Sequence, residues 1–317
     1  MHWILILCVL ILTVFSGSFG LFCYVFARGA RSEDFFCSQL ERNPKNARLC
    51  QRIRQDLAWC QTQKPHIWQI ESFDKTPLVA AFLPTPMTRR GTVILCHGWR
   101  SSGATDFCWI MQDYLARGFD LLILDQRGHG RSGGRWLGFG VLEAKDLLCW
   151  TNEVCRRQGG GHPILLHGMS MGAASVQFAL DLPLPDAVVG AVADCGFSSP
   201  RAELAHVLRD LRLPVWPLLP LLHLYARLFA GYGLSDRCAT DVMQHNRRPV
   251  VWLHGERDKL VPCHMSRAAH DAAICRKWLV TVPGAGHELA TLVDPDRCWE
   301  AIDQLICHCL QDQTQHA

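Results

Sequence analysis

Residues 163–173 read PILLHGMSMGA, an apolar run that stops abruptly at the pentapeptide GMSMG. The run has the composition of a buried strand and residues 173–180 that of a helix, so the pentapeptide lies where a strand must turn into a helix. Glycines on both sides of Ser170 permit a tight, strained backbone that lifts the serine hydroxyl out at the carboxyl end of the strand. The pattern predicts a nucleophile elbow, with Ser170 as nucleophile and the Met171 amide beside it. An ordinary glycine-containing turn is the alternative.

Buried-strand patterns recur along the chain, and helical periodicity separates them. The strand candidates are 92–96, 121–125, 164–167, 187–194, 250–254 and 278–282. The helix candidates are 107–117, 141–157, 261–274 and 295–309. Residues 67–73 and 78–83 precede the series and indicate an antiparallel edge hairpin. This alternation predicts an α/β fold with a mostly parallel, doubly wound sheet, whose active groups lie at the carboxyl ends of the strands.

Residues 198–247 interrupt the alternation and are too long for a plain connection between a strand and a helix. Within them, the apolar segment 211–230 contains two arginines, a histidine and three prolines, which make it a costly membrane span. We therefore expect an inserted helical lid over the active site.

The N-terminal segment 3–27 contains no charged residue. Its 25 residues would form a helix of about 37 Å, which is enough to cross a hydrocarbon core of about 30 Å. A cleaved signal peptide is the alternative, but no Lys or Arg precedes the apolar stretch, which continues past the small residues of 16–20. The sequence favours an uncleaved anchor. Arg28 and Arg31 favour a cytoplasmic catalytic domain, but this single asymmetry leaves the side of the membrane open.

Residues 32–63 mix charges with apolar residues at the spacing of an amphipathic helix that follows a break at Asn43 and Pro44. The predicted division of the chain is a transmembrane anchor over 3–27, a helical spacer over 28–65, a main domain over 66–310 with the lid at 198–247, and a polar tail over 311–317.

The charge balance excludes some classes of partner. Lys and Arg total 32 against 29 Asp and Glu, without a basic run interleaved with aromatic residues, so we expect no nucleic-acid partner. The 16 cysteines include no C-x-x-C pair and several lie in apolar runs, so they predict neither a metal site nor a disulfide framework.

A serine hydroxyl needs a base to accept its proton and an acid to orient that base. His287 follows the strand that ends at residue 282, and Asp258 follows the strand that ends at residue 254. Each has an ordinary explanation alone, as a loop histidine or a helix cap, but both follow successive strands. We predict a Ser170, Asp258 and His287 triad, with Glu256 as the rival acid and Glu288 as a more distant one.

The tetrahedral oxyanion needs two donors that already point at it. The Met171 amide is one candidate. The other is the amide of Trp99, which follows the His97–Gly98 pair in the loop after the first central strand. We expect His97 itself to have a structural role.

Gly128, Gly130 and Gly133 match the G-x-G-x-x-G pattern after a strand candidate. A dinucleotide site would need a helix opening directly from these glycines, whereas 134–140 keeps the chain irregular, and no acidic residue ends the next strand. The stretch is interpreted as a tight loop, and no cofactor is expected.

Together the motifs HGWRSSG, DQRGHGRSGG, GMSMG, ADCGFSSP, HGERDKLVP and VPGAGH resemble the α/β-hydrolase superfamily over about residues 67–310. The spacing is similar to the branch of serine aminopeptidases and monoglyceride lipases, and most of all to uncharacterised bacterial α/β-hydrolases with one N-terminal membrane anchor. The resemblance implies the triad and the two oxyanion donors given above. Trp99 is bulkier than the usual residue and is expected to narrow the acyl pocket, while Asp74-Lys75 replaces an Asp-Gly turn and is expected to alter only the surface.

The expected function is a membrane-anchored serine hydrolase that cleaves a small-molecule acyl ester, including lipid-like esters, through an acyl-Ser170 intermediate. An amidase or peptidase with the same triad is one alternative. A non-catalytic binding protein on the same fold is another. Dehalogenase chemistry is disfavoured because it requires a carboxylate at the position of Ser170.

Overall fold

The computed structural model describes residues 2–29 and 46–315, with side chains up to residue 311. The predicted break at Asn43 and Pro44 lies outside the described residues. Of the predicted polar tail, residues 311–315 continue the last helix, α12 (Pro295–Gln315).

One eight-stranded sheet forms the centre of the molecule, in the order β1-β2-β4-β3-β5-β6-β7-β8. Its strands are β1 (His66–Glu71), β2 (Pro77–Leu83), β3 (Gly91–Cys96), β4 (Phe119–Asp125), β5 (Ile164–Met169), β6 (Val188–Asp194), β7 (Val250–Gly255) and β8 (Lys277–Val282). The β1–β2 and β2–β4 pairs are antiparallel, and the remaining pairs are parallel. The predicted mostly parallel sheet with an antiparallel edge hairpin is confirmed.

Helices cover both faces of this sheet, so its central strands are buried on both sides and are apolar throughout. Along β3, Ile94 packs into one core, and Val93 and Leu95 pack into the other, because successive side chains point to opposite faces. The first core contains residues of α5 (Val141–Gln158), α6 (Met171–Ala179), α9 (Ala239–Met243) and α10 (His264–Ala272). The second contains residues of α3 (Ala47–Thr62), α4 (Gly103–Ala116), α11 (Ala290–Val293) and α12.

Two predicted helices begin elsewhere than expected. α4 begins at Gly103, before the predicted residue 107, because the Ser102 side chain caps it by accepting a hydrogen bond from the Thr105 amide. α10 begins at His264, because residues 258–262 form the loop that carries Asp258.

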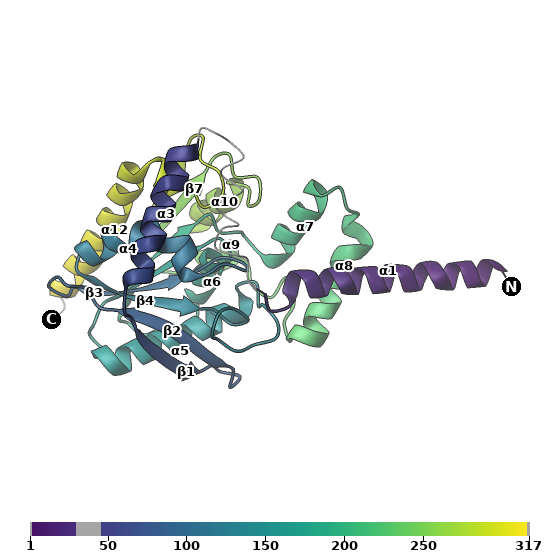
Figure 1. The fold of residues 1–317 in the computed structure, drawn as a ribbon, viewed down its shortest axis with the longest axis horizontal. Helices are drawn as coiled ribbons and strands as arrows, with labels where there is room; N and C mark the ends of the chain where they lie inside the picture. The colour runs from purple at the N-terminus through teal and green to yellow at the C-terminus, as the bar shows by residue number, and fades with distance from the viewer. Residues whose placement is uncertain (1, 30–45, 316–317) are drawn as a thin grey trace.

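The N-terminal helix α1 (His2–Phe26) stands out from the body of the molecule, with its N-terminus far from the sheet (Figure 1). The inserted segment contributes α7 (Pro200–Asp210), α8 (Val215–Tyr225) and the π-helical turn η2 (Ala226–Ala230). Figure 1 shows this helical group beside the sheet and next to the part of α1 nearest the body. It is the helical insertion that the sequence predicts.

The turn at Asp74 is not only a surface feature, contrary to the sequence-based expectation. Asp74 Oδ2 accepts a hydrogen bond of 2.9 Å from Arg127, whose guanidinium is buried and also binds Asp146 of α5. The Ser72 hydroxyl donates to the same Asp146 carboxylate. Because a buried guanidinium needs a full set of acceptors, Asp74 helps to hold the edge hairpin against the loop after β4 and against α5.

The turn between β5 and α6 packs so tightly against β3 and against itself that two of its residues must be glycine. A Cβ atom on Gly172 would lie 1.8 Å from the Cys96 carbonyl oxygen, and one on Gly168 would lie 2.1 Å from the Gly172 carbonyl oxygen. These are backbone atoms on a central strand and on the turn itself, so they cannot move aside.

We therefore expect Gly172→Ala to lower the free energy of unfolding by about 3 kcal/mol or more, as overpacking against backbone does. Gly161→Ala is the matched control, because its Cβ would meet nothing within 4 Å and the change should stay below about 1 kcal/mol. Thermal unfolding of both variants in detergent measures the difference. Equal melting temperatures for the two would show that the turn is not held by this close contact.

Candidate active site

Ser170 lies at the turn between β5 and α6 in a left-handed backbone conformation, with φ of 55° and ψ of −117°. A non-glycine residue rarely adopts such a conformation unless its surroundings impose it. The amide of Ser170 donates a 2.8 Å hydrogen bond to the Asp194 carbonyl at the end of β6, which fixes the turn against the neighbouring strand. The strained turn presents the hydroxyl at the carboxyl edge of the sheet, as the elbow pattern predicts.

A chain of hydrogen bonds joins Ser170 to the two partners that the sequence selects. His287 Nε2 lies 2.9 Å from Ser170 Oγ, and His287 Nδ1 lies 2.6 Å from Asp258 Oδ2. The histidine follows β8 and the aspartate follows β7, so the carboxyl ends of β5, β7 and β8, in the same half of the sheet, supply the three side chains. The structure thus brings together residues that are up to 117 positions apart in the sequence.

The surroundings favour an ionised Asp258. Its Oδ1 accepts hydrogen bonds from the amides of Leu260 and Val261, at 3.0 and 2.9 Å, and its Oδ2 lies 3.3 Å from His254 Nε2. Burial raises the pKa of this carboxyl, but His287 and His254 outweigh burial and hold the pKa well below its usual range. A carboxylate that stays ionised can keep the proton of His287 on Nδ1, which leaves Nε2 free to accept a proton from Ser170.

His287 is correspondingly basic. Burial lowers the pKa of the imidazole, but the neighbouring Cys195 and Asp258 side chains outweigh burial and raise this pKa above its usual value. The Asp258 carboxylate thus stabilises the imidazolium that forms when His287 accepts the Ser170 proton, which is what general base catalysis on this hydroxyl requires.

The two rival acids lie elsewhere. Glu256 is exposed and binds the Thr281 hydroxyl at 2.8 Å, on the outer side of the loop. Glu288 lies 3.5 Å from Nε2 of His287, which is the wrong side of the ring for orienting Nδ1. Burial, followed by the nearby Asp106, raises the pKa of Glu288 above its usual value, which opposes the negative charge that an orienting acid needs.

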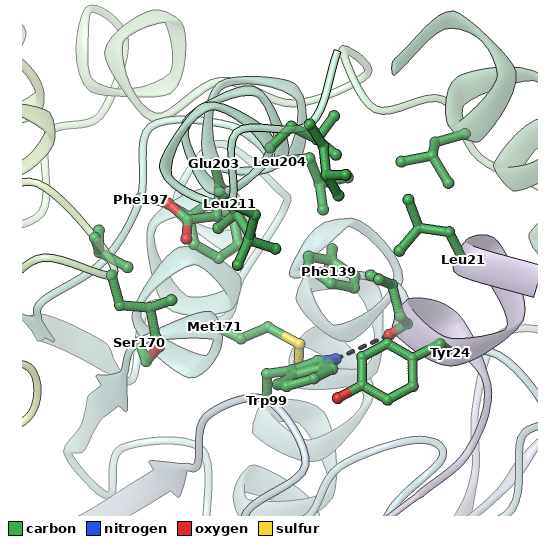
Figure 2. Close-up of a pocket in the computed structure, with 17 residues that line it drawn as sticks. Leu21, Tyr24, Trp99, Phe139, Ser170, Met171, Phe197, Glu203, Leu204 and Leu211 are labelled. Carbon is green, nitrogen blue, oxygen red and sulfur yellow. Dashed lines mark hydrogen bonds between the residues drawn. The ribbon is translucent and has the colours of Figure 1, made fainter. Parts of the chain in front are cut away.

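The two predicted oxyanion donors are placed next to Ser170. Met171 is the first residue of α6, where amides have no acceptor within the helix. Trp99 follows Gly98, which packs so tightly that an added Cβ would lie 3.2 Å from Ser170 Cβ. Trp99 and Met171 both line the cavity into which Ser170 faces (Figure 2).

His97 has the structural role expected of it. Its Nδ1 donates to the Gly98 carbonyl oxygen at 2.8 Å, and its Nε2 accepts from the Gln126 amide at 3.2 Å. Burial lowers the pKa of His97 to about 4, so the ring is neutral and holds the loops after β3 and β4 together.

The cavity in front of Ser170 has a volume of about 160 Å³ and is lined almost entirely by apolar side chains. Its walls come from α1, the inserted helices, and the loops at the carboxyl edge of the sheet, as Figure 2 shows. The lining comprises Leu21, Tyr24, Val25, Trp99, Phe139, Ser170, Met171, Phe197, Glu203, Leu204, Val207, Leu208, Leu211, Leu213, Leu222, Leu260 and Val261. Such a cavity suits an aliphatic chain attached to a group that Ser170 can attack.

Glu203 is a polar member of this lining that the sequence analysis missed. Its side chain is 5% exposed, and its Oε2 has no hydrogen-bond partner in the described part of the chain. Burial raises the pKa of this carboxyl to about 8, which leaves it protonated at neutral pH. No sequence signal identifies it, because a glutamate in the first turn of a helix such as α7 is ordinarily exposed.

One cluster of potential metal ligands occurs among the described residues, formed by Cys195, Asp258 and His287, whose donor atoms lie within 4.8 Å of one another. Asp258 and His287 already bind each other, and His287 also binds Ser170. We therefore assign the cluster to the serine site.

Comparisons with known proteins agree with this architecture. The family model described as alpha/beta hydrolase fold matches residues 91–223. The chain is 28% identical to a monoacylglycerol lipase of Mycolicibacterium smegmatis, over 63% of this chain and 82% of that one. It is 27% identical to the uncharacterised protein YqkD of Bacillus subtilis, over 69% of this chain and 76% of that one.

Among solved structures, an esterase of Pyrococcus furiosus aligns with a TM-score of 0.62 at 20% identity, covering 81% of this chain and 94% of that one. The solved structure and the family match over residues 91–223 assign the α/β-hydrolase fold to this chain. The resemblance that the sequence motifs indicate is confirmed at this level.

The position of Asp258 yields a prediction about the orienting acid. Asp258→Asn should lower kcat for ester hydrolysis by about 10³–10⁴-fold, because an amide cannot hold His287 in the tautomer that accepts the serine proton. Glu256→Gln serves as the control and should change kcat by less than about threefold, since its carboxylate binds on the outer side of the loop. Steady-state kinetics on a soluble ester measures both. A reversed order would make Glu256 the orienting residue.

Glu203 yields a prediction about pH. Below its pKa of about 8 the side chain is neutral, and above it a carboxylate forms inside an apolar cavity. We expect KM for an octanoyl ester to rise as the pH passes through 8, because the charge opposes occupation by an alkyl chain. In Glu203→Gln, which cannot ionise, this rise should disappear. The same pH dependence of KM in both proteins would contradict the assignment.

Proposed function

We propose that this protein is a membrane-anchored serine hydrolase that cleaves carboxylic esters through an acyl-Ser170 intermediate. The observation that carries the proposal is the hydrogen-bonded chain from Ser170 Oγ through His287 to Asp258, at a strained turn that opens into an apolar cavity. A merely structural serine would not require left-handed backbone geometry at the edge of a cavity.

The reaction follows from the positions of these atoms. His287 Nε2 accepts the Ser170 proton while Oγ bonds to the ester carbonyl carbon, and the Met171 and Trp99 amides stabilise the oxyanion. His287 then donates that proton to the departing alcohol oxygen, which leaves acyl-Ser170. Water, deprotonated by His287, releases the acid and restores the serine hydroxyl. No cofactor takes part in this sequence.

Ester cleavage is favoured over amide cleavage by the site and by the relatives. The cavity offers Glu203 as its buried polar side chain apart from Ser170, whereas a peptide would present several polar groups that need partners. The M. smegmatis relative is a monoacylglycerol lipase, and the P. furiosus structure is that of an esterase. An amidase with the same residues is the alternative, and matched octanoyl esters and amides distinguish the two.

The length and surface of α1 support the membrane anchor. Trp3 and Tyr24 are 83% and 64% exposed and lie 21 residues apart, or about 32 Å along a helix, which matches the spacing of the two interfaces of a bilayer. Phe22 and Phe26, in contrast, are fully buried in the body of the protein. Cleavage after Gly20 would break this packed helix, so we favour an uncleaved single-pass anchor over a signal peptide.

Arg28, which follows the proposed span, is bound by the main domain. The guanidinium of Arg28, one of the two arginines after the span, donates hydrogen bonds of 2.6 and 2.5 Å to the carbonyl oxygens of Gly130 and Ser132. Its presence is therefore explained by the fold and carries little information about topology.

The inserted segment 198–247 is proposed to be the acyl-binding lid. Leu204 and Leu208 of α7 and Leu222 of α8 line the cavity opposite the loops that carry the reacting groups. Trp216, the most prominent aromatic residue of the segment, is 79% exposed and does not line the cavity, so it is not expected to contact the acyl chain.

Covalent labelling tests the proposed function. A fluorophosphonate probe should label the wild-type protein and leave Ser170→Ala unlabelled, with ester hydrolysis lost in parallel. Ser175→Ala, one turn further along the buried face of α6, should label normally. Absence of labelling in the folded wild-type protein would favour a non-catalytic binding protein, and full labelling of Ser170→Ala would place the nucleophile elsewhere.

A further inference from the structure

From the placement of α1 we infer that the last two turns of the anchor helix form a wall of the acyl pocket, so that the enzyme takes long-chain esters from the bilayer that holds the anchor. This inference rests on the proposed function and adds a substrate class and a source to it. Leu21, Tyr24 and Val25 of α1 line the same cavity as Ser170 (Figure 2).

The catalytic domain binds the end of α1 through the carbonyl groups that a helix leaves without partners in its last turn. The Val25 carbonyl oxygen accepts a 2.9 Å hydrogen bond from Trp99 Nε1, and the Phe26 carbonyl oxygen accepts a 2.7 Å bond from the Leu137 amide. The Tyr24 carbonyl oxygen accepts from the guanidinium of Arg100. The helix end is therefore fixed to the domain by directional bonds.

These bonds connect the anchor to the reacting groups. Trp99 supplies a proposed oxyanion donor from its backbone and binds α1 with its indole, as the dashed line in Figure 2 shows. Arg100 packs over the ring of Trp99 at 4.9 Å and over that of Tyr24 at 5.1 Å. The loop after β3 thus fixes the position of the anchor helix relative to the active site.

The cavity opens between α1 and the turn that joins α7 to α8. Four lining residues are also exposed, namely Tyr24, Leu211 and Leu213, at 64%, 59% and 39%, and, in the loop that carries Asp258, Leu260 at 44%. If the hydrocarbon core begins near Trp3, a thickness of about 30 Å ends after about 20 residues of helix, close to Cys23 and thus between Leu21 and Tyr24. The opening then lies at the boundary between hydrocarbon and head groups.

The inserted helices present an apolar surface beside the part of α1 that precedes this opening. The Tyr225 hydroxyl donates to the Phe15 carbonyl oxygen at 3.2 Å, and the Phe229 and Phe19 rings are 5.3 Å apart, so this part of the lid packs along the anchor. Its outward side chains include Leu224, Leu228 and Phe229, at 43%, 66% and 47% exposure. Because this apolar patch is continuous with a membrane helix, we expect it to contact the bilayer.

The site thereby selects an ester whose chain already lies in the membrane. The alkyl chain would pass from the hydrocarbon into the cavity between α1 and the lid, and the ester group would reach Ser170 at its inner end. A water-soluble short ester could reach Ser170 but would leave most of the cavity unfilled.

The first experiment places a larger α1 side chain in the cavity, in full-length protein reconstituted in phosphatidylcholine vesicles. Leu21→Trp should lower the ratio of kcat/KM for 4-nitrophenyl palmitate to that for 4-nitrophenyl acetate by at least tenfold, because each excluded methylene costs about fourfold in binding. Leu10→Trp, on the exposed face of the same helix, should leave the ratio unchanged. Leu21→Ala, which enlarges the cavity, should shift the preferred acyl length upward.

Fluorophosphonate labelling of Ser170 in each variant verifies folding and separates the two proposals. If the wild type labels and the ratio does not change in either Leu21 variant, the wall is excluded while the serine hydrolase stands. If the wild type does not label, the proposed function itself is wrong.

The second experiment tests the source of the substrate. 4-Nitrophenyl palmitate is placed either in the vesicles that hold the enzyme or in separate vesicles at the same total concentration. Initial rates should be at least tenfold higher when enzyme and ester share a bilayer. Equal rates, or no hydrolysis in either arrangement, would overturn the inference.

Discussion

The close contact between the turn after β5 and the backbone of β3 is the constraint on which the site depends. Gly172 leaves no room for a side chain against the Cys96 carbonyl of β3, and Gly168 leaves none against the backbone of Gly172. The residue between them, Ser170, has a left-handed backbone conformation. The strain is sustained by bonds to the neighbouring strand, such as that from the Ser170 amide to the Asp194 carbonyl. The hydroxyl is therefore held at a fixed point, toward which the loops after β7 and β8 direct Asp258 and His287.

The loops at this edge of the sheet also hold the end of α1 in place. The last carbonyl groups of α1 receive donors from the loops after β3 and β4, including Trp99, Arg100 and Leu137. The buried Phe22 and Phe26 add apolar contacts to the same junction. If α1 is the membrane anchor that we propose, this junction also fixes the position of the cavity relative to the membrane.

Most of the fold could be predicted from the sequence, because a strand that is buried on both faces has a continuous run of apolar residues. The residues around Ser170 could be located for a related reason, since Asp258 and His287 each follow such a run and parallel strands end at one edge. The role of α1 in the cavity could not be predicted. Because this helix is apolar on all sides, its sequence does not show which face contacts the rest of the protein. The burial of Glu203 and the pairing of Asp74 with Arg127 also escaped prediction, since both depend on contacts between distant segments.

The most direct measurement is an experimental structure of the full-length protein in a lipid nanodisc after reaction with a hexadecyl fluorophosphonate. Our account predicts phosphorus bonded to Ser170 Oγ, the phosphoryl oxygen within hydrogen-bond distance of the Met171 and Trp99 amides, and the alkyl chain between Leu21 of the anchor and Leu222 of the lid. An adduct on another residue would contradict the nucleophile. An alkyl chain that leaves Ser170 along a route without contact to α1 would contradict the role of the anchor.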